Sequence, residues 1–358
     1  MKLAIVGSVG LPAKYGGFET LVENLALHHD ANRIECAVTV YCSAKFYADR
    51  PDRFHNVELK YIPLGANGPQ SIPYDIVSMF SALWNGADVI LVLGVSGAIA
   101  IPLLRLLGSA RVVTNVDGIE WKRAKWRSAS RWFLRLSERI AAKWSHVVIA
   151  DNAEIAKHIM AHYGVACNVI PYGGDHVLAT CADDSAREEL PSRFALAICR
   201  IEPENNVAMI VEAFARQPAI DLVFVGNWSA SAYGLGIREH FAGIPHLHLL
   251  DPVYDAARLK SLREGASVYI HGHSAGGTNP SLVEAMHCHD LVLAFDCGFN
   301  RSTTEGAAHY FRDCNHLGTM LAQIADGTIK PRLGVLKEIA DRRYRWEIVA
   351  RQYFDIIS

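Results

Sequence analysis

The fold is decided by the stretch Gly272-His-Ser-Ala-Gly-Gly-Thr-Asn-Pro-Ser-Leu-Val-Glu284, which follows an apolar run at 266–271. The run predicts a buried strand. Asn279 before Pro280 predicts a helix start, because proline presets φ and has no N–H to leave unpaired there. The intervening loop would direct backbone N–H groups and the positive end of a helix dipole at one point, which suits a phosphate. Glu284 would reach a sugar hydroxyl on that phosphate. An ordinary strand–turn–helix corner is the alternative interpretation.

A second glycine-rich loop near the N-terminus has the same layout. A buried-strand run at 2–6 leads into a loop that ends at Gly16 and Gly17, and an amphipathic helix follows. The glycine pair would let a ligand approach the backbone closely. The spacing matches neither the dinucleotide-binding pattern Gly-x-Gly-x-x-Gly nor a P-loop. The two units, one near each end of the chain, predict two α/β domains that face each other across a cleft.

The composition describes a folded protein of about two domains. The 358 residues are 51% hydrophobic and 20% charged, as in globular proteins. No apolar run reaches the ~18–20 residues of a membrane span, and the first residues resemble a strand more than a signal peptide. Eight cysteines without a C-x-x-C pair predict reduced thiols and a cytoplasmic location.

Apolar runs alternate with helical segments along the chain. Strands are expected at 3–7, 37–42, 57–62, 89–93, 111–115 and 147–150, and then at 194–199, 222–225, 246–250, 267–271 and 292–294. This alternation predicts doubly wound parallel sheets, whose ligands bind at the carboxyl ends of the strands. The pattern breaks near 170–175, the polar stretch 180–189 reads as a linker, and the tail at 337–357 is expected to be helical.

Several histidines lie close together in the sequence. His271 and His273 alternate at a strand end, and His287 and His289 flank Cys288. No carboxylate completes a recognisable ligand pattern, so neither a metal nor another cofactor is expected. We expect these side chains to be hydrogen-bonded histidines of the core or the cleft.

A basic segment covers residues 122–143. It contains eight Lys or Arg residues and one acid, Glu138, for a local charge of +7 in a chain of net charge −2. Its cations recur every four residues along one side of a helix, with tryptophans between them, which suits anionic lipid headgroups. A solvated basic face packed on the sheet is equally compatible. No nucleic-acid-binding module accompanies it, so nucleic acid is not an expected partner. The candidate acceptor or membrane residues are Lys122, Arg123, Trp126, Arg127, Arg131 and Arg135.

Five segments carry a resemblance to a known family. They are Pro12-Ala-Lys-Tyr-Gly-Gly-Phe-Glu-Thr20, Asp117-Gly-Ile-Glu-Trp-Lys-Arg123, Arg200-Ile-Glu-Pro-Glu-Asn-Asn206, the 271–284 stretch and the tail at 344–346. On these segments the chain resembles the GT-B glycosyltransferases of family 4, most closely a bacterial subgroup that includes rhamnosyltransferases of cell-surface polysaccharide assembly. The resemblance implies an N-terminal Rossmann-like acceptor domain at 1–174, a C-terminal Rossmann-like nucleotide-sugar donor domain at 175–336, and a C-terminal helix at 337–358 that packs back on the first domain.

The sequence departs from the family pattern at two donor positions. Asn205 stands where the family usually has a lysine that, with Arg200, clamps the donor diphosphate. Gly276 replaces the first glutamate of a pair, which leaves Glu284. The backbone N–H groups from Gly276 through Gly277 to Thr278 would take over part of the anion binding. The missing glutamate fits a 6-deoxy sugar, so dTDP-L-rhamnose is the expected donor, with UDP- and GDP-linked sugars as alternatives.

The resemblance implies a retaining, metal-independent transfer. Arg200 and the helix start at Thr278–Asn279 would stabilise the leaving diphosphate. Asp117, after the 111–115 strand, is the candidate beside the reacting sugar, and Glu120 is the second. A helix N-cap beside Gly118 is the alternative for Asp117.

The expected acceptor is a polyprenyl-diphosphate-linked sugar or another saccharide. The protein would be cytoplasmic, with peripheral contact to the inner face of the cytoplasmic membrane if the basic segment binds lipid. Two other classes stay open: a non-catalytic nucleotide-sugar-binding scaffold, and a nucleotide-sugar epimerase of GT-B shape.

Overall fold

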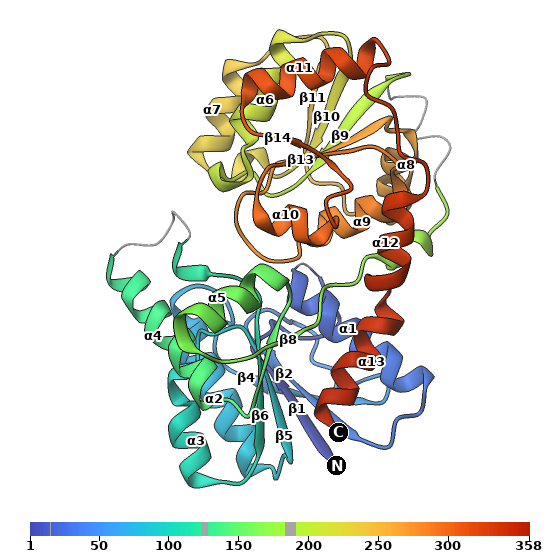
Figure 1. Cartoon of the computed structure of the whole chain (residues 1–358). Coiled ribbons are helices and arrows are strands. Elements are labelled where there is room, and N and C mark those ends of the chain that lie inside the picture. The colour runs from blue at the N-terminus through green and yellow to red at the C-terminus, as the bar shows by residue number, and fades with distance from the viewer. Residues whose placement is uncertain (15, 123–127, 183–190) are drawn as a thin grey trace. The chain divides into compact units, whose positions relative to one another are not determined.

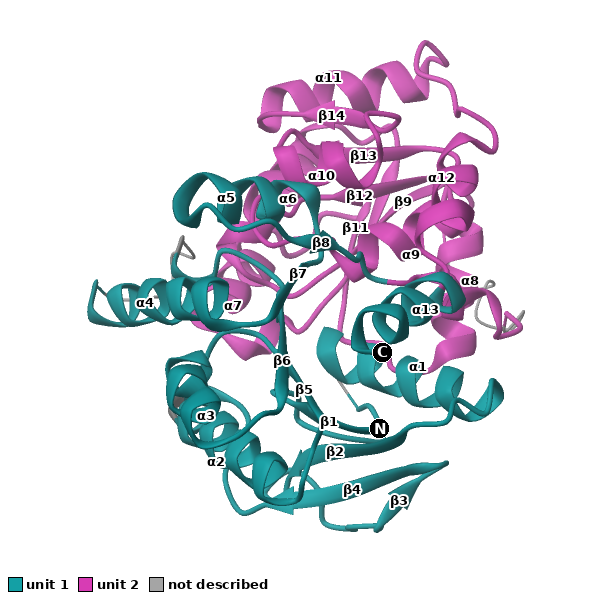
Figure 2. Ribbon diagram, turned by 60° about the horizontal axis from the view of Figure 1, so that its bottom comes forward, with its two compact units in different colours: residues 1–172, 346–358 teal, residues 173–345 magenta. Residues whose placement is uncertain are grey.

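The computed structural model describes the chain from residue 1 to 358 apart from residues 15, 123–127 and 183–190. The chain forms two compact units, one of residues 1–172 with 346–358 and the other of residues 173–345 (Figures 1 and 2). Each unit is a doubly wound α/β domain with a parallel sheet, as the sequence predicts.

Unit 1 contains an eight-stranded sheet in the order β3-β4-β2-β1-β5-β6-β7-β8, in which only the β3–β4 pair is antiparallel. Leu3 pairs with Val38 on one side and with Val89 on the other. Helices cover both faces, so the central strands are buried almost throughout and have no polar face. The strands are β1 (Lys2–Val6), β2 (Ala37–Ser43), β3 (Arg53–Phe54), β4 (Val57–Ile62), β5 (Val89–Leu93), β6 (Arg111–Val116), β7 (Val147–Ala150) and β8 (Asn168–Val169).

The helices of unit 1 divide between the two faces of this sheet (Figure 1). One face packs against α1 (Gly17–Ala31) and the C-terminal helix α13 (Trp346–Ile357), which share one hydrophobic core with the strands. The other face is covered by α2 (Ser71–Trp84), α3 (Ile101–Leu107), α4 (Ser128–Trp144) and α5 (Ala153–Tyr163). The C-terminal helix therefore returns to the N-terminal domain, as expected.

Unit 2 contains a six-stranded, all-parallel sheet in the order β11-β10-β9-β12-β13-β14. Its strands are β9 (Phe194–Ile198), β10 (Asp221–Val225), β11 (Leu247–Leu250), β12 (Val268–His271), β13 (Val292–Phe295) and β14 (His309–Phe311). Its helices are α6 (Val207–Arg216), α7 (Ala232–His240), α8 (Ala256–Gly265), α9 (Pro280–Cys288), α10 (Gly298–Thr303), α11 (Cys314–Ala325) and α12 (Val335–Arg343).

The tail is two helices, so the expectation of one helix over 337–357 is wrong. Tyr344 is fully buried and ends α12, because its carbonyl accepts the N–H of Gly174 at 2.8 Å and lies 3.2 Å from Nε2 of His287. That carbonyl is bonded to residues outside the helix, and a separate helix, α13, begins at Trp346.

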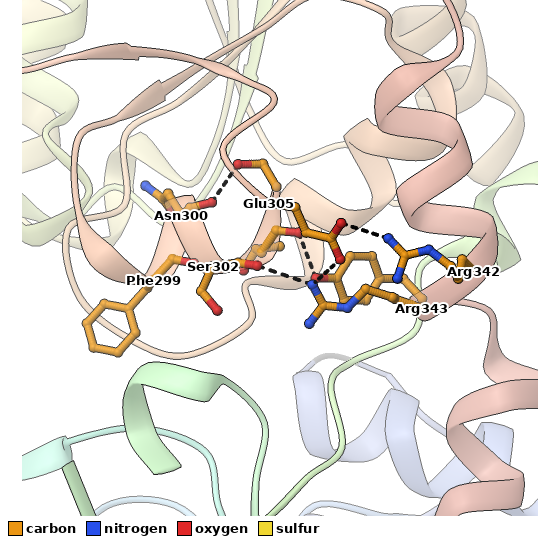
Figure 3. A network of polar contacts seen from close by, with 9 residues as sticks. Phe299, Asn300, Ser302, Glu305, Arg342 and Arg343 are labelled. Atoms are coloured by element: carbon orange, nitrogen blue, oxygen red, sulfur yellow. Dashed lines mark hydrogen bonds and ion pairs between the residues drawn. The ribbon is translucent and has the colours of Figure 1, made fainter. Parts of the chain in front are cut away.

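An acidic clamp anchors the end of α12 within unit 2. Glu305 accepts bonds from Arg342 at 2.7 Å and from Arg343 at 2.9 Å, and Arg343 also donates to the Ser302 carbonyl at 3.3 Å (Figure 3). Burial alone would raise the pKa of Glu305, but the two guanidinium groups outweigh it and hold that pKa below its usual value. The carboxylate thus stays ionised and ties α12 to the segment after α10.

Candidate functional site

The loop after β12 is held by the turn that precedes α6. Ser274 donates both its N–H, at 3.0 Å, and its Oγ, at 2.7 Å, to the Glu204 carbonyl. Asn206 Nδ2 donates to the Gly272 carbonyl at 2.8 Å. Position 272 requires glycine, because a Cβ there would lie 2.2 Å from the Asn205 carbonyl oxygen. The two loops therefore form one fixed support at the carboxyl ends of β9 and β12.

The start of α9 carries a buried donor that has no acceptor. Asn279 is the N-cap residue, and its side chain makes no capping hydrogen bond. Its Nδ2 is buried and has no hydrogen-bond partner in the part of the chain that the structure describes. Gly276 has a φ of 119°, which favours glycine, and a Cβ there would be in ordinary van der Waals contact with Asn279 Oδ1 at 3.5 Å. A buried unsatisfied donor costs about 1–3 kcal/mol, so this helix start is suited to receive an anionic or polar ligand atom.

We call the loop at 272–279 and the start of α9 the cradle, since they are predicted to hold the donor phosphates; its neighbouring residues lie as follows. Gly277 and Thr278 are buried between Gly276 and the helix. Arg200, after β9, is exposed, and its Nη1 lies 3.6 Å from Glu202 Oε1, too far for a hydrogen bond. Asn205 is buried, and its Nδ2 donates to the Arg200 carbonyl at 2.8 Å. Asn205 therefore fixes the turn that carries Arg200, and its contact with a donor stays a prediction.

Glu284 lies in the middle of α9, largely buried, and is held by two partners. Arg263 of α8 donates to its Oε2 at 2.5 Å, and His176 Nε2 lies 3.4 Å from its Oε1. Burial alone would raise the pKa of Glu284, but the Arg263 charge and the His176 contact outweigh it, and the pKa lies below its usual value. Glu284 is thus a fixed carboxylate that can accept bonds from ligand hydroxyls. The sequence contains no local signal for Arg263 or His176, because both reach Glu284 only through the tertiary fold.

The histidines of β12 form a buried stack. The rings of His271 and His273 lie 4.4 Å apart and nearly parallel, and Tyr269 stacks on His289 at 5.6 Å. Nε2 of His271 and of His289 is buried without a partner among the described residues, whereas His287 Nε2 lies 3.2 Å from the Tyr344 carbonyl oxygen. Burial lowers the pKa of His271 well below its usual value, and burial with the Arg263 charge lowers that of His289 to about 3. Both rings are neutral.

In unit 1, acidic side chains support the glycine-rich loop after β1. Glu19 is buried, and its Oε1 accepts the Val9 N–H at 2.8 Å. Glu23 accepts the Ala13 N–H at 3.1 Å. Position 16 requires glycine, because a Cβ at Gly16 would lie 1.9 Å from Glu19 Oε2. Two of the loop amides are therefore engaged by carboxylates, a setting that suits sugar hydroxyls better than phosphate. Gly17 is the first residue of α1.

A second group of side chains lies at the carboxyl ends of β6 and β7. Asp117 follows β6 and Asp151 follows β7, and both are half-buried. The hydroxyl of Tyr353, in α13, accepts a hydrogen bond from Asn115 Nδ2 at 2.6 Å. Burial raises the pKa of Tyr353, and the negative charges of Asp151 and Asp117 raise it further, which places both near this phenol. The sequence analysis missed Asp151, although it follows its strand just as Asp117 does. Glu120 opens the short 3₁₀ turn at Glu120–Lys122.

The basic segment is in part outside the described residues. Arg123, Trp126 and Arg127 fall there, whereas Lys122 ends the 3₁₀ turn and α4 begins at Ser128. Arg131 and Arg135 of α4 are exposed. The acid of the segment, Glu138, points inward. Its Oε1 accepts Trp121 Nε1 at 3.2 Å and the Tyr163 hydroxyl at 2.7 Å, and lies 2.9 Å from His158 Nε2.

The described residues contain neither a cluster of metal ligands nor a membrane-spanning helix. No three His, Cys, Asp or Glu side chains of the described part of the chain gather as a metal ion requires. Within the same residues, no helix has the length and apolar character needed to cross a membrane.

Comparison with known proteins places these sites on a known fold. The family described as "Domain of unknown function (DUF1972)" matches residues 1–175. No curated protein matches the sequence. Sucrose-phosphate synthase from Thermosynechococcus elongatus superimposes with a TM-score of 0.82 at 17% identity, over 99% of this chain and 98% of that one. HepE from Anabaena in complex with UDP superimposes with a TM-score of 0.73 at 17% identity, over 99% of this chain and 98% of that one.

A third similar structure is described as trehalose-6-phosphate from E. coli bound with UDP-2-fluoro glucose. It gives a TM-score of 0.74 at 10% identity, over 100% of this chain and 99% of that one. At these identities the likeness shows the fold. The chain has the GT-B fold, with two Rossmann-like α/β domains.

Proposed function

We propose that the protein is a retaining, metal-independent glycosyltransferase of family 4 type, which transfers a sugar from a nucleotide-diphosphate donor. The observation that carries the proposal is the buried, unpartnered Nδ2 of Asn279 at the start of α9, on a GT-B fold. A phosphate oxygen of the donor would supply the missing acceptor, and the α9 dipole would stabilise its charge.

The described side chains suggest a division of roles. Arg200 and the helix start stabilise the leaving diphosphate, and the fixed carboxylate of Glu284 accepts hydroxyls of the nucleotide part. Asp117 or Glu120 of unit 1 contacts the reacting sugar, and Gly16 and Gly17 leave room for it. In the transfer, the bond from the anomeric carbon to the phosphate oxygen breaks, with its electrons left on phosphate. The acceptor oxygen bonds the same face, and its proton passes to that phosphate.

The donor we favour is dTDP-L-rhamnose, on the subgroup resemblance and on Gly276 in place of a glutamate. HepE and the E. coli structure contain UDP or a UDP-sugar, which supports UDP as the alternative base. The acceptor is a polyprenyl-diphosphate-linked sugar or a saccharide of bacterial surface polysaccharide, reached at the inner face of the cytoplasmic membrane.

A thermal-shift comparison of dTDP, UDP and GDP tests the donor site. A nucleotide at 100 times its Kd adds ~2.7 kcal/mol of stability, which gives a clear rise in Tm. Asn279→Ala should abolish most of this rise, while Asn315→Ala, an exposed asparagine of α11, should retain it. An equal rise in Tm for both variants would show that the start of α9 does not bind the nucleotide. A larger rise with UDP or GDP than with dTDP would contradict dTDP-L-rhamnose as the donor.

Donor turnover separates the proposal from the other classes. A transferase releases nucleotide diphosphate from its donor, slowly with water and faster with acceptor. A binding scaffold would show the thermal shift without release, and an epimerase would change the sugar without freeing the nucleotide.

A further inference from the structure

Three helices of unit 1 expose large apolar side chains where soluble proteins normally place charged ones. Trp84, the last residue of α2, is 79% exposed, and Leu106 near the end of α3 is 80% exposed. Leu107 and Leu103 of α3 are 59% and 50% exposed, and Trp144, the last residue of α4, is 46% exposed. Single exposed leucines are ordinary, but a group of this kind marks an interaction surface.

The ends of these helices lie together. A Cβ at Gly108, just after α3, would lie 2.3 Å from Leu83 Cδ1 of α2. Arg105 of α3 donates from Nη1 to the Trp144 carbonyl at 2.9 Å. Both ribbon views show α2 and α3 side by side on the sheet face opposite α1 and α13 (Figures 1 and 2). We call this surface the α2–α4 face; it comprises Trp84, Leu103, Arg105, Leu106, Leu107, Arg131, Arg135, Arg139, Lys143 and Trp144.

The charges of the α2–α4 face have one sign. The helices α2, α3 and α4 contain two acidic residues, Asp75 and Glu138, and both are buried. Their five basic residues are all exposed: Arg105, Arg131, Arg135, Arg139 and Lys143. The chain as a whole has a net charge of −2, so this face is strongly positive against a slightly negative background.

A groove beside α4 brings several of these cations together. It has a volume of about 520 Å³ and is lined by Trp132, Arg135, Leu136, Arg139, Lys143, His162 and Tyr163. No carboxylate lines it in the described part of the chain. Arg135 also lies over the Trp121 ring at 5.2 Å, which holds its guanidinium beside the groove. A phosphate-bearing headgroup fits this chemistry.

We infer that the α2–α4 face docks on the surface of an anionic lipid bilayer, with the ends of α2 and α3 inserted among the headgroups. Helices that lie at a membrane interface typically combine leucine and tryptophan with arginine and lysine, as this face does. The cations are spread along the length of α4, which matches a plane of phosphates better than a single acidic group. The inference extends the proposed membrane-bound acceptor, but it rests on lipid binding, which needs no donor or acceptor.

Vesicle flotation of the full chain tests the inference, with and without phosphatidylglycerol in phosphatidylcholine vesicles. Wild type should float with anionic vesicles and, because peripheral charge contacts are screened, less at high salt. Leu106→Ser/Leu107→Ser should lower the partition coefficient about ten-fold or more at every salt concentration. Arg135→Glu/Arg139→Glu should remove the preference for anionic vesicles.

Two matched variants serve as controls. Leu235→Ser/Leu333→Ser changes exposed leucines of unit 2, and Arg312→Glu/Lys330→Glu changes exposed cations of unit 2. Both should float as wild type does. Equal flotation of the leucine variant of α3 and wild type would overturn the inserted edge. A third outcome would also overturn the inference: wild type does not float but forms a dimer, and Leu106→Ser/Leu107→Ser dissociates that dimer. A second copy of the chain would then cover this face. The vesicle experiments do not test the glycosyltransferase proposal, which is tested separately by the nucleotide thermal shift.

Discussion

At the scale of single residues, Glu284 shows how a buried carboxylate keeps its charge. Desolvation opposes ionisation, and Arg263 and His176 reverse the balance. Removal of one partner from a buried pair costs far more than loss of a surface pair, since it leaves a buried charge unmatched. Arg263 is therefore a positioning residue for the proposed donor site.

Arg263→Gln should weaken nucleotide binding by about ten-fold, because Glu284 loses the partner that fixes its Oε2. Its pH dependence should also change. In wild type the pKa of Glu284 is lowered, so binding persists into acidic solution. Without Arg263 that pKa rises, and affinity should fall at a higher pH. Calorimetric titration from neutral to acidic pH measures both effects, with Arg238→Gln, which breaks an exposed pair with Asp251, as the control. Parallel pH profiles for Arg263→Gln and wild type would argue for a merely structural role.

Asp75 gives a prediction on stability. It is buried in α2, and burial raises its pKa to about 8, although the Gly97 N–H opposes this. The unfolded value is about 3.9, so folding takes up a proton between these limits. The contribution of Asp75 to the free energy of unfolding should therefore be greatest below pH ~4 and fall as pH rises toward 8, by up to ~1.4 kcal/mol per pH unit.

Asp75→Asn should remove that slope, because an amide is neutral at every pH and its oxygen can still accept the Gly97 N–H. Urea unfolding at a series of pH values measures the difference between variant and wild type. The stability of the variant relative to wild type should grow from pH 4 to pH 8. A constant difference over that range would show that Asp75 is already ionised in the folded protein.

The residues differ in what their sequence could reveal. The contacts of Glu284, Asn279 and Gly276 with a donor stay predictions, but the loop and the helix start that contain these residues were predicted, because a strand followed by glycines and Asn-Pro is a local pattern. The partners Arg263 and His176 were not, since they come from α8 and from the turn after residue 173, far along the chain. The burial of Glu138 within a basic segment was also not predicted, because Trp121, His158 and Tyr163, which contact its carboxylate, lie outside α4.

At the scale of elements, the support of the cradle depends on a close approach of two loops. Gly272→Ala would place a Cβ 2.2 Å from the Asn205 carbonyl oxygen, so one loop must move. We expect a loss of about 1–3 kcal/mol in the free energy of unfolding, and weaker nucleotide binding because the loop carries the start of α9. Gly318→Ala is the matched control. It lies in α11 with nothing within 4 Å of the added Cβ, and should stabilise by about 0.5–1 kcal/mol. Equal stability of both variants would show that the loops are not fixed against each other.

The interior strands and the edge strand β11 were predictable, and the edge strands β3, β8 and β14 were not. β5 and β9 are continuous apolar runs, and β1 is one after Lys2, because helices cover both their faces. The edge strands β3, β8 and β14 have two or three residues and no periodic pattern to detect. The break between two helices at Tyr344 was also not predicted. Its carbonyl contacts Gly174 and His287, which are too far away in the sequence to be seen in a local pattern.

At the scale of the whole molecule, the last thirteen residues complete the core of unit 1, although residues 173–345 separate them from it. Trp346, Val349 and Tyr353 are buried in the core that contains β1 and α1, and Phe354 stacks on His28 at 6.0 Å. Formation of this core therefore requires closure of a very long loop. The expectation of a returning C-terminal helix came from the family resemblance, because a periodic apolar face does not say which domain it covers.

Val349→Asp should destabilise unit 1 by several kcal/mol, since it buries a carboxylate with no partner at a position that is fully buried in wild type. Arg351→Asp is the matched control, because it changes the exposed side of the same helix and should alter stability by no more than ~0.5 kcal/mol. Hydrogen exchange resolved by peptide separates the units. The amides of β1, β2 and β5 should lose protection in Val349→Asp, while those of β9, β10 and β12 keep it. Uniform loss over both sheets would mean that the two units unfold as one cooperative structure, and unchanged exchange in β1 would show that α13 adds nothing to the stability of the domain on which it packs.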